Sequence, residues 1–259
     1  MAGMMMEVRL GKKAPRFDKR TFKLSRYTAA LPPAPGQAFF QSHVPEWPMM
    51  MNDTLGDCVC AAAGHMIEQW TTYVGNPVVP TDDEILKAYE VIGGYVPGDE
   101  ATDNGCDMLT ALNTWRKQGI AGHRIVAFAA VRQGTEEALI EDVKLSVSMF
   151  GNCYLGLALP ETAQSQSNAV PGTGWHVDDS DPAASAVGSW GGHCVPAVGY
   201  DEDTVTVVTW GMLVRMSWNF LVRYCDEGYA VLSRDWIEKT RLAPSGFDFE
   251  TLTQDLNSL

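Results

Sequence analysis

The helix patterns and the strand patterns of this 259-residue chain occupy different parts of the sequence, and this order limits the folds open to it. The predicted helices cover residues 58–73, 81–92, 107–119 and 135–151. The predicted strands cover residues 153–160, 193–200, 204–211 and 228–233, with a long loop at 161–191 and a short helix at 217–225. Helices first and strands later predict an α+β fold with a helical half and a sheet half.

The bulk properties are those of a globular protein, with 46% hydrophobic and 20% charged residues. The longest apolar stretch covers only residues 125–131, far less than the roughly 20 residues that span a bilayer. The first residues contain no apolar region typical of a secretory signal. We therefore expect no membrane partner and a location that keeps cysteines reduced.

Positive charge is concentrated at the N-terminus. Residues 1–26 carry a net charge of +6. Because the total is −13, the rest of the chain carries a net charge of −19. The segment that follows, 30–37, is rich in proline, which favours an extended arm over residues 1–42. Such an arm could bind a protein partner or pack along its own acidic domain. No nucleic-acid-binding motif accompanies it, so a nucleic-acid partner is not expected.

The chain has six cysteines, too few for a disulfide scaffold at this length. No cluster of His and Cys has the spacing of a zinc site. We therefore expect free thiols, no metal and no cofactor.

One cysteine has the setting of a nucleophile. Cys58 stands in "NDTLGDCVCAAAGHMIEQW" (52–70), where a Gly/Asp turn precedes a predicted helix, and the positive end of a helix stabilises a thiolate. A cysteine nucleophile also needs a base and donors for the developing oxyanion. His193, 135 residues downstream, is the best candidate base. Asn52 could donate its side-chain N–H to an oxyanion that the Cys58 backbone N–H also contacts.

The order of four blocks resembles that of papain-like cysteine peptidases, over most of residues 43–234. The blocks are the turn and helix at 52–70, the Gly-Cys turn and helix at 103–120, "HCVPAVGYDEDTVTVVTWG" (193–211) and "GYAVLS" (228–233). The resemblance implies that Cys58 is the nucleophile, His193 the base and Asn52 the oxyanion amide, where the family uses Gln. It implies no cofactor and a peptide or amide substrate. The chain is also similar to uncharacterised papain-fold proteins of bacterial and phage genomes.

The chain departs from the family at several positions. The orienting Asn of the family would stand at Val208, or at Thr209 if sixteen residues are counted from His193. Thr209 could accept the imidazole N–H through its hydroxyl. Val59 replaces the usual Trp, and a carboxylate at Asp57 would oppose thiolate formation if it pointed inward. The arm is too short and proline-rich to be the long helical inhibitory propeptide of the family.

The other candidates have simpler interpretations. His176 is a competing base but lies in the long loop, and His65 is expected to be a hydrogen-bonded core residue. The carboxylates at 178, 179 and 181 predict a solvated loop rather than a cation site. Cys60 is expected to pack in the core, and Cys106, at the Gly-Cys turn, has no disulfide partner at Leu55.

Together these features predict a papain-like α+β fold with a helical subdomain at about 43–150, a barrel-like β-rich subdomain at about 151–245 and a cleft between them. The predicted function is a cysteine hydrolase that uses a Cys58–His193 dyad. The alternative is a catalytically impaired papain-fold protein that acts as a structural or interaction module, for example on a phage particle. The expected location is therefore cytoplasmic or virion-associated. An amide-forming or amide-transferring enzyme on the same fold is equally compatible with the sequence.

Overall fold

A computed structural model describes residues 8–167, 174–240 and 247–258. The helices are α1 (Leu24–Tyr27), α2 (Cys58–Tyr73), α3 (Asp82–Gly93), α4 (Met108–Lys117), α5 (Glu136–Phe150), α6 (Glu161–Ser167), α7 (Trp218–Tyr224), α8 (Arg234–Thr240) and α9 (Phe249–Asn257). The strands are β1 (Ala38–Phe39), β2 (Ile125–Ala130), β3 (Cys153–Leu159), β4 (Gly191–Tyr200), β5 (Thr204–Thr209), β6 (Met212–Ser217) and β7 (Cys225–Ser233). Residues 1–7 of the predicted arm, 168–173 of the predicted loop and 241–245 of the predicted β-rich subdomain lie outside the described residues.

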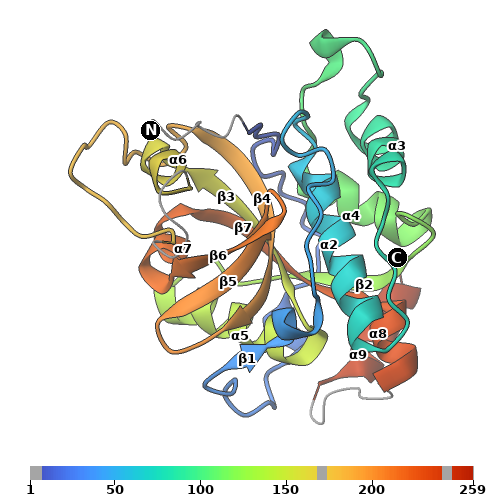
Figure 1. Ribbon diagram of the computed structural model, residues 1–259. Coiled ribbons are helices and arrows are strands. Elements are labelled where there is room, and N and C mark those ends of the chain that lie inside the picture. The colour runs from blue at the N-terminus through green and yellow to red at the C-terminus, as the bar shows by residue number, and fades with distance from the viewer. Residues whose placement is uncertain (1–7, 168–173, 241–246, 259) are drawn as a thin grey trace.

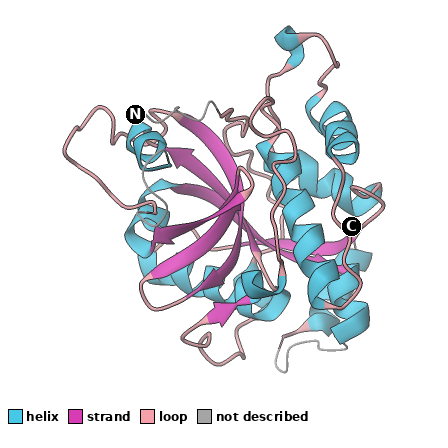
Figure 2. Cartoon of the chain, in the orientation of Figure 1, coloured by secondary structure: helices cyan, strands magenta, loops and turns pink. Residues whose placement is uncertain are grey.

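The architecture confirms the predicted α+β class. Helices α2, α3 and α4 lie together on one side of the molecule and most of the sheet lies on the other (Figures 1 and 2). Within the described residues, the sheet order is β2-β7-β3-β4-β5-β6, with β1 added beside β4. The paired strands are antiparallel, and the sheet is open rather than closed into the predicted barrel-like form. The subdomain boundaries near residues 42, 150 and 245 stay predictions.

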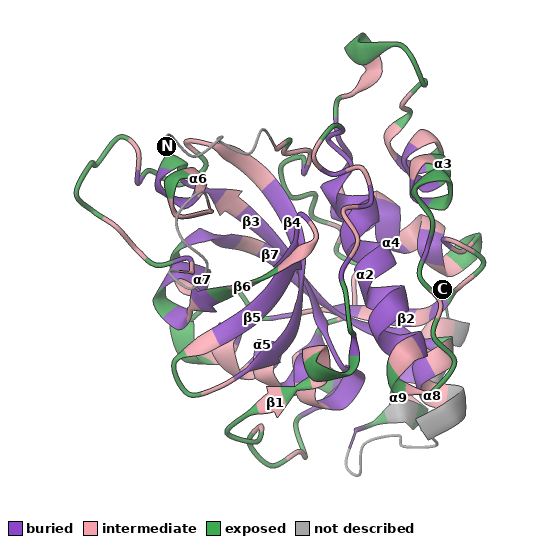
Figure 3. Cartoon of the chain, in the orientation of Figure 1, coloured by how far each residue is buried: buried purple, intermediate pink, exposed green. Residues whose placement is uncertain are grey.

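Local signals in the sequence explain where the helices begin and end. Thr81 and Glu84 form the predicted capping box at the start of α3, which ends at Gly94 in the left-handed conformation, with a φ of 75°. Thr135 accepts a hydrogen bond from a first-turn N–H of α5. Helix α2 begins at Cys58, as predicted, and its small and apolar side chains allow it to be buried almost all round (Figure 3).

Among the described residues, two large hydrophobic clusters form most of the core, one around the sheet with α5 and α7, the other around α2, α3 and α4, and a third, small cluster contains Val208. Polar contacts fix α2 against the turn that joins α5 to β3. Trp70 donates its indole N–H to the Phe150 carbonyl at 2.7 Å, and the Asn152 amide donates to Gln69 Oε1 at 2.8 Å. Because these groups are buried, their hydrogen bonds hold the helical half in one position relative to the sheet.

Several elements were not predicted. Strand β2 lies in an apolar stretch that carried no strand prediction, and β6 follows a turn at Gly211, where φ is 69°. Helix α6 occupies part of the predicted long loop, and α8 and α9 lie beyond the last predicted strand. None of these elements carries a predicted site residue.

Candidate active site

Cys58 is the first residue of α2 and is only 1% exposed. Asp57, the residue before it, makes no side-chain cap on the helix, so the first N–H groups are not neutralised by a capping carboxylate. Two consecutive methionines with positive φ, Met50 at 55° and Met51 at 62°, shape the turn that leads into the helix. This strained turn is the local structure that places the thiol at the start of α2.

His193 lies on β4, and the end of β5 holds its ring. Nε2 of His193 is 2.7 Å from the Thr209 hydroxyl, and the ring stacks on Trp210 at 4.6 Å between centroids with 19° between the planes. Nδ1 is buried and has no hydrogen-bond partner among the described residues. The imidazole therefore has one nitrogen fixed and one nitrogen free.

The structure distinguishes between the two candidate orienting positions. Thr209 contacts the imidazole, whereas Val208 is buried in a separate cluster with Val44, Trp47 and Val198. Adjacent residues of a strand point to opposite faces, so only one of the two can contact the ring. Trp210, with a φ of 47°, follows in a strained conformation that turns its ring onto His193.

The thiol and β4 meet where α2 packs on the sheet. The backbone N–H of Cys194, the residue after His193, acts on the Cys58 thiol and favours its ionised form. Burial outweighs this effect and raises the pKa of Cys58 to about 12. Burial also lowers the pKa of His193 to about 3. Both groups are therefore neutral near pH 7 in this arrangement, and no hydrogen bond joins them in the part of the chain that the structure describes.

Asn52 and Asp57 lie inside the turn. The Asn52 amide donates to the Leu55 carbonyl at 3.4 Å and also acts on the Asp57 carboxyl, and Asn52 is 3% exposed. The Asp57 carboxyl is fully buried, and burial raises its pKa well above 3.8 despite the nearby Asn52 amide. Asp57 does point inward, as considered from the sequence. With its pKa raised it holds a proton over more of the pH range and opposes the thiolate less than a carboxylate would.

Part of the N-terminal arm covers this site. The Lys12 N–H donates to the Gly192 carbonyl at 3.0 Å, beside His193, and the Cys106 N–H donates to the Gly11 carbonyl at 2.9 Å. Gly11 packs so closely on the Gly56 carbonyl that a Cβ would overlap it, and its N–H acts on the Cys58 thiol. This part of the arm thus packs along its own domain, one of the two outcomes considered from the sequence.

The remaining sequence candidates lie elsewhere. His65 Nε2 donates to the Pro48 carbonyl at 2.8 Å, and burial lowers its pKa to about 4, as fits a core histidine. His176 is exposed on the loop, where its main chain pairs with the Gln166 side chain. The loop carboxylate Asp179 pairs with Arg223 at 2.6 Å, and the described residues contain no cluster of three or more metal-binding side chains.

Cys60 and Cys106 are free, as expected, and so are the other four cysteines. Cys106 and Cys60 are nevertheless neighbours, since a hydrogen bond that the Cys60 thiol donates to Cys106 contributes most to raising the pKa of Cys60. Among the described residues, no helix has the length and apolarity of a membrane span.

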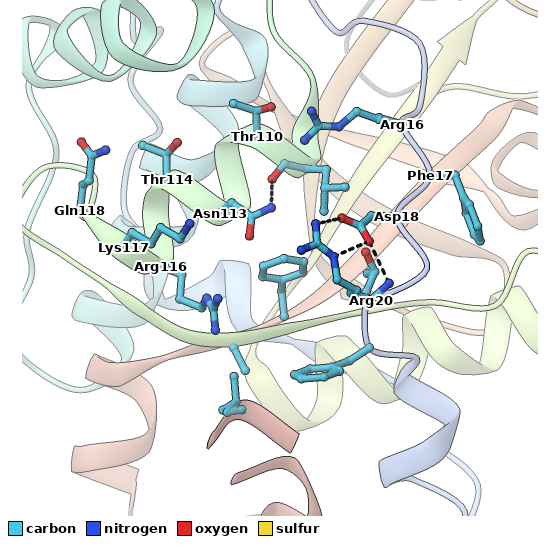
Figure 4. Close-up of a pocket in the computed structure, with 16 residues that line it drawn as sticks. Arg16, Phe17, Asp18, Arg20, Thr110, Asn113, Thr114, Arg116, Lys117 and Gln118 are labelled. Carbon is cyan, nitrogen blue, oxygen red and sulfur yellow. Dashed lines mark hydrogen bonds and ion pairs between the residues drawn. The ribbon is translucent and has the colours of Figure 1, made fainter. Parts of the chain in front are cut away.

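A separate cavity of about 850 Å³ lies between the arm, α4 and β2 (Figure 4). Arg16, Arg20, Arg116 and Lys117 line it, and Arg20 is already paired with Asp18 at 2.6 Å. Cys58, His193, Asn52 and Thr209 are not among its lining residues. The cavity is therefore distinct from the candidate active site.

Comparison with known proteins identifies the fold. No family sequence model and no curated protein sequence matches the chain. Solved structures do. Xylellain, a cysteine protease from Xylella fastidiosa, superposes with a TM-score of 0.63 at 14% identity, over 90% of this chain and 98% of that one. Procathepsin B from Trypanosoma congolense gives a TM-score of 0.54 at 13% identity, over 87% of each chain. A stem bromelain precursor gives 0.53 at 13% identity, over 89% of this chain and 78% of that one.

These similarities establish a papain-like fold, the fold that the order of sequence blocks predicted. Sequence reasoning did not identify three features of the site. They are the segment around Gly11 and Lys12, the acidic pair Asp226 and Glu227 that binds the Lys12 ammonium, and Asp103, which accepts the Gly56 N–H. A glycine within a basic run was the only signal for the first of these. The acidic pair and Asp103 contact residues that are distant in sequence, and no local pattern can reveal such contacts.

Proposed function

We propose that this chain is a cysteine hydrolase that cleaves peptide or amide bonds, with Cys58 as nucleophile and His193 as base. The observation that carries the proposal is the state of the imidazole. Thr209 holds Nε2 at 2.7 Å, and the unpartnered Nδ1 lies on the strand that packs against the start of α2. If Nε2–H is donated to Thr209, Nδ1 is the basic nitrogen that can accept the Cys58 proton.

The reaction then follows from ordinary thiol chemistry. His193 takes the Cys58 proton, and the thiolate attacks the acyl carbon of the substrate. The Cys58 backbone N–H and the side-chain amide of Asn52 donate to the oxyanion. His193 returns its proton to the leaving amine, and water, activated by the same imidazole, hydrolyses the thioester. Thr209 takes the orienting role that the family assigns to Asn.

A second candidate function rests on the covered thiol. Cys58 is 1% exposed and His193 is fully buried, with Gly11 lying against the thiol. A chain that kept this arrangement permanently would be an inactive papain-fold module, for example one associated with a virion. Its protein partner would then bind the exposed part of the basic arm, around Lys19 and Arg20.

Alkylation at pH 6 to 7, followed by mass spectrometry, separates the two. The full chain carrying Gly11→Val, which the Gly56 carbonyl excludes from its present position, is treated with iodoacetamide or a peptidyl epoxide. A hydrolase shows selective labelling of Cys58 that His193→Ala abolishes, together with cleavage of a peptide library that Cys58→Ala abolishes. Labelling of Cys58 no faster than that of a free thiol in solution would contradict the proposal and favour the inactive module.

A further inference from the structure

Lys12 of the arm is a buried cation. Its side chain is 1% exposed, and Nζ lies 2.9 Å from Asp226 Oδ2 and 3.2 Å from Glu227 Oε1. Nζ also donates to the Lys13 carbonyl at 3.1 Å. Burial works to lower the pKa of Lys12, but the two carboxylates outweigh it and raise the pKa above 10.5. Lys12 is therefore a charged ammonium held by two carboxylates, whereas most surface lysines extend into water.

The walls around Lys12 fit a long unbranched side chain. Gly156 on β3 leaves the space that Lys12 occupies, because a Cβ at Gly156 would overlap Lys12 Cε. The same Cβ would lie 2.8 Å from Met108 Sδ and 2.7 Å from Glu227 Cγ, closer than ordinary contacts allow. We name the set Met108, Gly156, Asp226 and Glu227 the acidic pocket. Apolar walls with carboxylates at the end match the stem and the ammonium of lysine.

The acidic pocket is next to the candidate active site. The backbone of Lys12 bonds to Gly192, the residue before His193, and the preceding Gly11 lies against Cys58. The arm also bridges the two halves, since Cys106 bonds to both Gly11 and Lys13 through its backbone. A peptide bound by these same backbone groups would place one side chain in the acidic pocket and its main chain across Cys58.

Glu227 needs a cation at this position. Its side chain is 8% exposed, and besides Lys12 it is contacted by the Tyr229 hydroxyl, which donates to Oε2 at 2.9 Å. A buried carboxylate without a cation beside it is unfavourable, so an empty pocket would destabilise the ionised form of Glu227. An incoming cationic side chain that replaced Lys12 would restore the ion pairs.

We propose that the acidic pocket is the specificity pocket of this enzyme and selects peptides with a lysine side chain at the position that Lys12 now fills. The arm fills the pocket with the Lys12 side chain, as a product or an inhibitor would, and a substrate must displace it. The inference that the pocket selects a substrate rests on the proposed hydrolase function. Binding of a lysine side chain in the pocket does not depend on catalysis.

The test measures binding in a chain that cannot cleave. The full chain carrying Cys58→Ala and Lys12→Glu, whose arm is repelled from the pocket, is titrated with a fluorescent peptide copying residues 9–14. Peptides with norleucine or glutamate at the Lys12 position serve as comparisons. The lysine peptide should bind at least about 10-fold more tightly than the norleucine peptide, since an ion pair with buried carboxylates is lost. Equal binding of the two peptides would overturn the proposal.

Two further variants locate the effect. Glu227→Gln should remove most of the preference for lysine, whereas Asp203→Asn, a change of the same charge in an exposed turn, should leave it unchanged. Gly156→Val in the same chain narrows the pocket and should weaken the binding of every peptide without altering the charge. Retention of the lysine preference in Glu227→Gln would contradict the assignment. If the chain prefers lysine peptides in binding but Cys58 is not labelled in the alkylation experiment, the proposed hydrolase function is refuted and the assignment of the pocket stands.

Discussion

Nε2 of His193 lies 2.7 Å from the hydroxyl of Thr209, sixteen residues further along the chain at the end of β5. A hydroxyl can accept the same imidazole N–H as the amide oxygen of the Asn that papain-like peptidases use. The smaller side chain of Thr209 can therefore hold the ring in one orientation. The stacked Trp210 covers this hydrogen bond and keeps water from competing for it. Thr209 therefore has both the contact and the chemistry that the proposed orienting role requires.

Thr209→Val should lower peptide hydrolysis by about 10- to 100-fold, the range expected when a general base loses its orientation. Valine has nearly the same shape, so the fold should persist while Nε2 loses its partner. The measurement is kcat/KM against pH with a peptide substrate. Thr209→Ser retains the hydroxyl and should stay within a few-fold of the original rate. An unchanged pH profile in Thr209→Val would show that the hydroxyl does not orient the ring.

The sequence was sufficient for the elements that carry their own signals. The capping box at Thr81 and the small, apolar run after Asp57 determine α3 and α2 locally. Strand β6 was not predicted because its pattern is short and partly exposed, and it gains its place by pairing with β5. Propensity alone cannot show such pairing, since strand stability depends on neighbours across the sheet.

The same reasoning explains what could be known of the site. Cys58 and His193 were predicted as site residues because their blocks occur in a recognisable order, and Thr209 was predicted by counting from His193. Lys12 could not be connected with Asp226, 214 residues away, because nothing in either segment encodes a contact with the other. The covering of the candidate site by the arm therefore becomes visible only in the folded structure.

Asp103 should be important for the turn that precedes Cys58. Its carboxylate accepts the Gly56 N–H at 3.0 Å and the Tyr89 hydroxyl at 2.5 Å. Asp103→Ala leaves both donors buried without a partner and should lower the free energy of unfolding by about 2 to 3 kcal/mol. Urea denaturation measures the loss. Asp99→Ala, which removes an exposed carboxylate that also accepts a main-chain N–H, should cost less than half as much. Equal losses would contradict a special role for Asp103.

Gly11→Val should detach the arm from the site. A Cβ at Gly11 would overlap the Gly56 carbonyl, so the backbone hydrogen bonds of Lys12 and Lys13 cannot persist in their present geometry. Hydrogen–deuterium exchange of peptides containing these amides should accelerate by at least about 10-fold. Gly36→Val is the matched control, because a Cβ at Gly36 would meet nothing within 4 Å. Protection that survives Gly11→Val would show that the arm is held mainly by the ion pairs of Lys12.

Glu68 on α2 should make the stability of the chain depend on pH. It is 2% exposed, and burial, with Glu46 nearby, raises its pKa from 4.5 to about 8. Below pH 4.5 the carboxyl is protonated in both states; as pH rises, the unfolded chain ionises first, so stability falls until about pH 8. The slope can reach about 1.4 kcal/mol per pH unit. Urea denaturation between pH 5 and 8 should show this slope in the original chain and in the exposed control Glu202→Gln, and a smaller one in Glu68→Gln. If all three share one slope, Glu68 ionises in the folded chain as it does in the unfolded one, and the helix that presents Cys58 contains a buried carboxylate rather than a neutral acid.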